Sequence, residues 1–347
     1  MDPAKLTIIG NNKGIALVYI ALAIFALVAC LGLTIDLGHM YVVRGELQNA
    51  ADAAALAGAW SLYKDPLNPG AAPALDFTRA QTAATDFINQ NSSDNVSLAN
   101  GTIATGCWNI TLNQLESCST IPPASPQVPA VTATINRSAG NNGGAVPTFF
   151  AKVFGANETT VSSRQAVAVS GFPGSVPGGT LFPLALSSCM TDQYFSQNPL
   201  PSPPTTITIS SVYVPGGANC YTGQWTSFKL DNNDVPTILD LMANGNPTPL
   251  RTGDDVWIEP GAKASLYKET NDNFRNIDVL MAIVDGSTGI TTHAEMAIKG
   301  FATFHIDSAN QAQKTVTGHF IQYFKDYPGI RPGGSVSNTV TPPLMVQ

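Results

Sequence analysis

The longest apolar run of the chain lies close to its first residue. From Ile15 to Ile35 the sequence IALVYIALAIFALVACLGLTI contains no charged residue. A helix of that length rises about 30 Å, which is enough to cross the hydrocarbon core of a bilayer. The pattern predicts a membrane-spanning helix, with residues 15–35 in contact with lipid.

Helix-favouring residues continue beyond this run. There is no proline between Gly14 and Pro66, so we expect one helix from Gly14 to about Tyr63, half in lipid and half out. At helical spacing the apolar and small residues of its second half share one face, formed by Val43, Leu47, Ala50, Ala54 and Ala57. Small side chains allow close approach of another element. The pattern predicts a helix-packing face and leaves open whether the chain's own domain or another subunit covers it.

The pattern changes after the helix to short alternating segments separated by turn-rich loops. It predicts an α+β protein: a long N-terminal transmembrane and stalk helix, a small mixed α+β domain and then a β-rich domain. Glycine and proline are dense in the segment Gly171–Gly179, which we interpret as a boundary, and the last segment has no periodicity. The expected parts are 1–63 (anchor and helix), 64–170 (small domain), 180–327 (β-rich domain) and 328–347 (disordered tail).

Composition narrows the class of protein. The chain has 17 basic and 24 acidic residues, a net charge of −7 and no basic cluster, so nucleic acid is excluded as an expected partner. The two lysines before the apolar run, Lys5 and Lys13, favour a cytoplasmic N-terminus. The bulk of the chain is then expected to be periplasmic or extracellular.

The cysteines fit an exported protein. Cys30 lies in the apolar run, and the others fall two on each side of the Gly171–Gly179 segment. Four cysteines allow three pairings, and we expect the two that stay within a domain, Cys107 with Cys118 and Cys189 with Cys220.

Candidate catalytic groups are few. His305 and Asp307 share a strand face in HID, and VDGSTG at 284–289 contains an aspartate and a serine of the kind found in some metal sites. Alternating polar residues usually mark a solvated strand face, and Gly-Ser-Thr-Gly is typical of a turn. No GxSxG, HExxH or CxxC pattern occurs. We therefore expect no catalytic, cofactor or metal residues, no small-molecule substrate and no enzyme activity.

Two segments carry a resemblance to a known family. The stretch KGIALVYIALAIFALVACLGLTIDLGHMYVVRGELQNAADAAALAGA, Lys13–Ala59, resembles the N-terminal segment of TadE/TadG-like proteins of bacterial Tad (Flp, type IVc) pilus assembly systems. The later stretch VPTFFAKVFGANETTVSSRQAVAVSG, Val146–Gly171, resembles the segment that closes their first exported domain. The resemblance implies a single-pass protein of the bacterial inner membrane that works with other pilus-assembly or pilin-like membrane proteins.

Processing of the N-terminus has alternatives. The resemblance implies a pilin-type peptidase site between Gly14 and Ile15, but Tyr19 stands where pilins usually carry glutamate, so we expect no cleavage there. Lipoprotein cleavage at Leu27–Cys30 or signal-peptide cleavage near Ala21–Ala26 would each leave an apolar stub. We expect a retained anchor and a structural role in a pilus or secretion assembly, with a membrane-tethered envelope binding module or cryptic hydrolase as the alternative.

Overall fold

The computed structural model describes residues 13–63, 75–120, 123, 125–195, 205–210, 222–261, 263–286, 293–321, 327–334, 337 and 339–346. Most of the expected linker after Tyr63 and the cysteine Cys220 lie outside these residues. The helices are α1 Lys13–Trp60, α2 Phe77–Asn89, the 3-10 helix η1 Ala151–Phe154, α3 Ser188–Phe195, α4 Val235–Asn244 and α5 Ala264–Asn273. The α+β class is confirmed.

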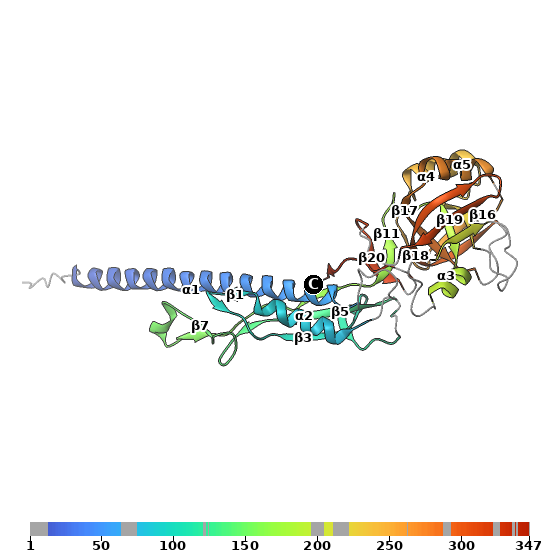
Figure 1. The fold of residues 1–347 in the computed structure, drawn as a ribbon. Coiled ribbons are helices and arrows are strands. Elements are labelled where there is room, and N and C mark those ends of the chain that lie inside the picture. Colours follow the sequence, from blue (N-terminus) through green and yellow to red (C-terminus); the bar gives the residue numbers. More distant parts are fainter. Residues whose placement is uncertain are drawn as a thin grey trace, which may run out of the picture. The chain divides into compact units, whose positions relative to one another are not determined.

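Helix α1, drawn in blue in Figure 1, is a single element of 48 residues. At 1.5 Å per residue it is about 70 Å long. It is long and apolar enough to cross a membrane, and nearly all side chains of its most apolar window are exposed. It includes Gly14 and Ile15, whose side chains lie outside the described part of the chain, so the doubted peptidase site stays a prediction.

The first compact unit combines Met1–Ala51, Ile88–Thr102 and Thr134–Arg164. Besides its part of α1, this unit contains three short antiparallel strand pairs. They are β1 (Ser92–Ser93) with β2 (Val96–Ser97), β6 (Asn136–Arg137) with β9 (Val161–Ser162), and β7 (Val146–Pro147) with β8 (Glu158–Thr159). The turn between β1 and β2 has positive φ angles at Asp94 and Asn95. Two such residues are typical of the tight turn of a two-residue hairpin.

The second compact unit combines Asp52–Phe87, Ile103–Ala133 and Gln165–Gln347. Its first sheet has the order β21-β10-β5-β3-β4. The bounds are β3 Thr102–Asn109, β4 Gln114–Glu116, β5 Gln127–Thr134, β10 Ala166–Val169 and β21 Leu344–Met345. Seven of the eight residues of β5 are buried. The sheet thus forms around a strand that is covered on both faces.

The second sheet of this unit has the order β13-β19-β18-β16-β14-β12-β17, and β17 also pairs with β18. The pairings therefore close a ring through β18, β16, β14, β12 and β17. All are antiparallel except β12 with β17. The bounds are β12 Leu184–Ser187, β13 Ile207–Ser210, β14 Gly223–Phe228, β16 Asp255–Glu259, β17 Ile277–Val284, β18 Ala294–Asn310 and β19 Thr315–Phe320.

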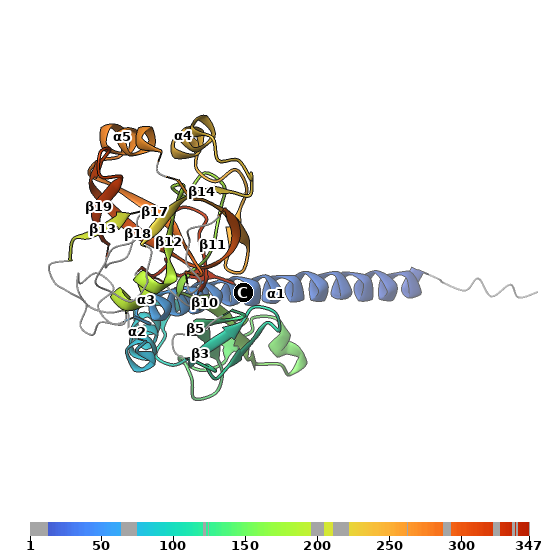
Figure 2. The same cartoon turned by 90° about the vertical axis from the view of Figure 1, so that its right-hand side faces the viewer.

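Three helices pack around this ring. Helices α4 and α5 lie side by side at one end, whereas α3 packs on β12 and β17 (Figure 2). The ring encloses the main apolar core, whose largest members are fully buried aromatic residues: Trp225, Phe228, Phe301, Phe304 and Phe320. This agrees with the expected β-rich character of residues 180–327.

Two sequence expectations are wrong in detail. Within the expected boundary Gly171–Gly179 lies a mostly buried strand, β11 (Phe172–Val176), which pairs with β15 (Leu250–Arg251) and β20 (Arg331–Gly334). The expected disordered tail 328–347 supplies β20 and β21 and buries Val340. In both segments the backbone donors and acceptors pair with strands far away in sequence, which a local pattern does not reveal.

Candidate functional site

The packing face of α1 is buried within the chain. Val43, Leu47, Ala50 and Ala54 are at most 1% exposed, whereas Ala57 is only partly buried. The buried positions continue through four further small residues, Ala51, Ala55, Gly58 and Ala59. Near the C-terminal end of the face, Gly58 and Ala59 are buried and Ala57 lies at its margin.

Gly58 marks a close approach of α2 and β5 to this helix. A Cβ atom at position 58 would lie 2.8 Å from Val131 Cγ1, 3.0 Å from the Ala80 carbonyl oxygen and 3.1 Å from Ala84 Cβ. Real Cβ contacts are rarely that short, so the helix can pack here only because residue 58 has no side chain. The small-residue pattern thus corresponds to tight packing inside the chain.

At the end of the apolar run, the Asp36 carboxylate binds three successive backbone N–H groups. Phe149, Phe150 and Ala151 donate to its oxygens at 2.7, 3.0 and 2.6 Å. These donors lead into the 3-10 helix η1, whose first N–H groups lack partners within the helix. Asp36 itself is only 5% exposed. The contact joins α1 to a segment more than a hundred residues later.

A second polar cluster lies on the next three turns of α1, from His39 to Glu46. Asp94 binds His39 Nε2 at 3.1 Å and the buried Arg137 guanidinium at 3.2 Å, and its backbone N–H donates to Glu46 at 2.7 Å. Arg137 also donates to the Ser93 carbonyl oxygen. These bonds hold the β1–β2 turn against the helix. Sequence analysis missed both Asp36 and this cluster as contact sites.

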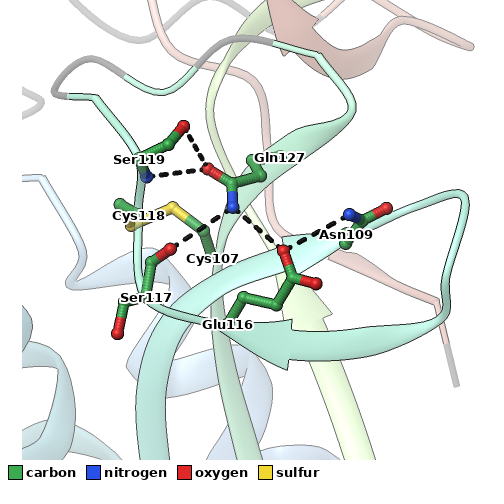
Figure 3. Close-up of a disulfide and its surroundings, with 7 residues drawn as sticks. All are labelled: Cys107, Asn109, Glu116, Ser117, Cys118, Ser119 and Gln127. Atoms are coloured by element: carbon green, nitrogen blue, oxygen red, sulfur yellow. Dashed lines mark hydrogen bonds between the residues drawn. A yellow bond between two sulfur atoms is a disulfide. The ribbon is translucent and has the colours of Figure 1, made fainter.

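The disulfide between Cys107 and Cys118 ties the end of β3 to the residues after β4, with Cα atoms 5.1 Å apart. Beside it, the buried Gln127 amide accepts hydrogen bonds from Ser119 and donates to Glu116 and to the Ser117 carbonyl oxygen (Figure 3). Hydrogen bonds from Gln114, Gln127 and Asn109 lower the pKa of the Glu116 carboxyl. Cys189 is also disulfide-bonded, while its expected partner Cys220 lies outside the described residues.

A charged cluster in the second unit centres on His293. Its Nδ1 lies 3.0 Å from the fully buried Glu259 carboxylate and its Nε2 lies 2.9 Å from Asp231, while the ring stacks on Trp257. Burial lowers the pKa of His293, but the hydrogen bond to Asp231 and the charge of Glu259 raise it above its ordinary value overall. Ligand atoms of the three groups lie within 4.8 Å of one another, a spacing that could hold a cation. Since each imidazole nitrogen already faces a carboxylate, we interpret the cluster as an ion-pair chain.

The strand-face candidates His305 and Asp307 lie close together, with Nε2 3.8 Å from Oδ1. His305 Nδ1 contacts Asp278 at 2.6 Å, and His319, its cross-strand partner, lies 3.4 Å from Asp307. All four side chains are partly exposed. Their arrangement is a network of neighbouring polar side chains on a solvated strand face. Asp285 of the VDGSTG motif pairs with Lys299, and Ser287 lies outside the described residues.

Comparison with protein families identifies the N-terminal part of the chain. Residues 14–61 match the family described as Flp pilus-assembly TadE/G-like, and residues 47–168 match the family described as Tad-like Flp pilus-assembly. Over residues 14–168 the chain is thus similar to Tad-type pilus-assembly families. The predicted resemblance is thereby confirmed. No curated protein and no solved structure matches the chain.

The Tad-like segment contains α1, the Asp36 contact, the packing face around Gly58 and the Cys107–Cys118 disulfide. The His293 and His305 clusters lie beyond it. The contacts that hold α1 to its own domain thus belong to the Tad-like segment itself. An aspartate at the end of an apolar helix was the sequence signal that could have pointed to the Asp36 contact.

Proposed function

We propose that this protein is a structural component of a Tad/Flp-like pilus or secretion assembly, anchored in the bacterial inner membrane by residues 15–35. The matches to two pilus-assembly families carry the proposal. The exposed apolar surface of α1 supports a single-pass membrane anchor. The Cys107–Cys118 disulfide supports a location of the rest of the protein in an oxidising compartment. Lys5 and Lys13 support a cytoplasmic N-terminus and a periplasmic or extracellular bulk.

The proposed mode of action is contact with other pilus-assembly or pilin-like membrane proteins, without catalysis. The buried face of α1 is occupied by the protein's own residues, with Leu47 and Ala54 fully buried. Contacts with another subunit must therefore use a different side of the helix. Two exposed positions on the part of α1 that follows Arg44 are available for such a contact, Gly45 and Asn49.

Site-specific photo-crosslinking in cells that assemble the pilus tests the proposal. A photoreactive residue at Asn49 should form crosslinks to other membrane proteins of the assembly. The same residue at Ser97, an exposed position of the same unit outside α1, is the matched control and should give far fewer intermolecular crosslinks. Absence of protein crosslinks at position 49 in assembling cells would contradict a structural role of α1 and favour an envelope binding module or hydrolase that uses the helix as a tether.

A further inference from the structure

The segment between β7 and β8 exposes an unusual amount of apolar surface. It includes η1 and reads FFAKVF from Phe149 to Phe154. Phe149 is 51% exposed, Phe150 40%, Val153 73% and Phe154 59%. Single exposed apolar residues are common on proteins, but a contiguous group of this kind marks an interaction surface.

The position of this segment along α1 is fixed by two contacts. The Asp36 carboxylate holds its first three backbone N–H groups. One turn closer to the N-terminus, the Phe150 ring lies directly on the backbone of Gly32, where a Cβ would come within 2.7 Å of it. Since Gly32 belongs to the apolar run, the segment overlaps the last turn of the expected membrane span by about 6 Å along the helix axis.

The exposed apolar surface of α1 itself continues through this region. Leu33 and Ile35 precede Asp36, and Leu37, Tyr41 and Val42 follow it, all of them exposed. The next exposed charged side chain on the helix is Arg44. The buried carboxylate of Asp36 has its charge satisfied by the three N–H groups, so it does not interrupt this surface. The exposed side chains of residues 149–154 are therefore continuous with the lipid-facing surface of the helix.

We propose that residues 149–154 form a second membrane contact, inserting their apolar side chains at the boundary between headgroups and acyl chains. The proposal rests on the membrane anchor proposed above. Apolar side chains at such a boundary bury about 5 to 10 Å into the bilayer. Lys152, exposed within the same segment, can extend its charged end to the phosphate groups while its methylene chain stays among apolar atoms. Asp36 is the residue that positions the segment against the helix.

Depth-dependent fluorescence quenching tests this proposal on the full chain. A Cys30→Ala background removes the cysteine that is free among the described residues, and Val153→Cys carries an environment-sensitive fluorophore. The protein is reconstituted in vesicles of phosphatidylethanolamine and phosphatidylglycerol. We expect a blue-shifted emission that nitroxides on the upper part of the acyl chain quench and that aqueous iodide does not. The matched control is Ser97→Cys, an exposed polar position of the same unit, which iodide should quench.

The possible outcomes distinguish failure of the proposed lipid contact from failure of the membrane anchor. If the protein remains in the vesicle pellet after an alkaline wash but iodide alone quenches the label at position 153, the lipid contact is refuted and the anchor stands. If neither iodide nor the lipid nitroxides quench the label, and dilution into excess lipid restores quenching, a second copy of the protein covers the segment. That result would also overturn the proposal. Asp36→Ala should abolish quenching by the lipid nitroxides at position 153 while the protein stays in the pellet.

Discussion

Replacing Gly58 by alanine should destabilise the protein, whereas the same change at Gly45 in the same helix should stabilise it. Alanine favours a helix interior over glycine by roughly 0.5–1 kcal/mol. At Gly45 nothing lies within 4 Å of the added Cβ, so this gain is kept. At Gly58 the methyl group meets Val131, Ala84 and the Ala80 backbone carbonyl at 2.8–3.1 Å. Overpacking of a tight core site costs about 1–3 kcal/mol.

The comparison between the two variants removes the helix-propensity term, because it is common to both. Gly45→Ala should therefore exceed Gly58→Ala in stability by about 1–3 kcal/mol. For a domain of this size class, each kcal/mol shifts the melting temperature by about 2–4 °C. Thermal unfolding of the full chain in detergent micelles, followed by near-ultraviolet circular dichroism, measures the difference. Equal melting temperatures for the two variants would show that α2 and β5 do not pack tightly on the helix at residue 58.

The remaining predictions concern the second unit. Non-reducing peptide mapping of protein isolated from membranes should join the peptide of Cys189 to that of Cys220, and a free thiol at Cys220 would contradict the predicted pairing. For His293, a folded-state pKa above the unfolded value gives stability that is fully present below about pH 6.5 and is lost as the pH rises through the folded pKa. The melting temperature of the wild type should therefore exceed that of His293→Gln by a margin that shrinks as the pH is raised from acidic to alkaline. A margin that does not change with pH would mean that the pKa of His293 is the same in the folded and unfolded protein, and a margin that grows with pH would mean that folding lowers this pKa.

Elements with a strong local signal could be predicted from the sequence. Helix α1 followed from fifty residues without a proline or a long polar break. Helix α4 likewise has strong local signals: the Asp234 side chain caps its start by accepting a hydrogen bond from the Thr237 N–H, and Gly245 ends it. By contrast, α5 was not predicted. Its sequence ASLYKETNDN is mostly polar, and only Leu266, Tyr267 and Thr270 are buried.

The contacts that define the candidate site were harder to predict, because their partners lie far apart in sequence. Asp36 binds N–H groups more than a hundred residues away, and any loop of suitable geometry could have provided them. The helical period indicates which residues of α1 share a face, but it does not indicate what covers that face. Burial of Gly58 depends on Ala80, Ala84 and Val131, which the spacing within α1 cannot specify.

The strand pairing that completes the first sheet has a consequence for export. Strand β10 lies between β5 and β21, and the Ser170 hydroxyl at its end donates to the Thr341 carbonyl 171 residues later. In the exported topology proposed above, β10 is an edge strand with unpaired N–H and C=O groups until that later segment has crossed the membrane. Closing so long a loop is slow compared with forming local structure, and an apolar edge such as AVAV readily pairs with other chains in the meantime. A translocating chain is therefore open to mispairing at this edge, and a chaperone that shields β10 would raise the yield of folded protein.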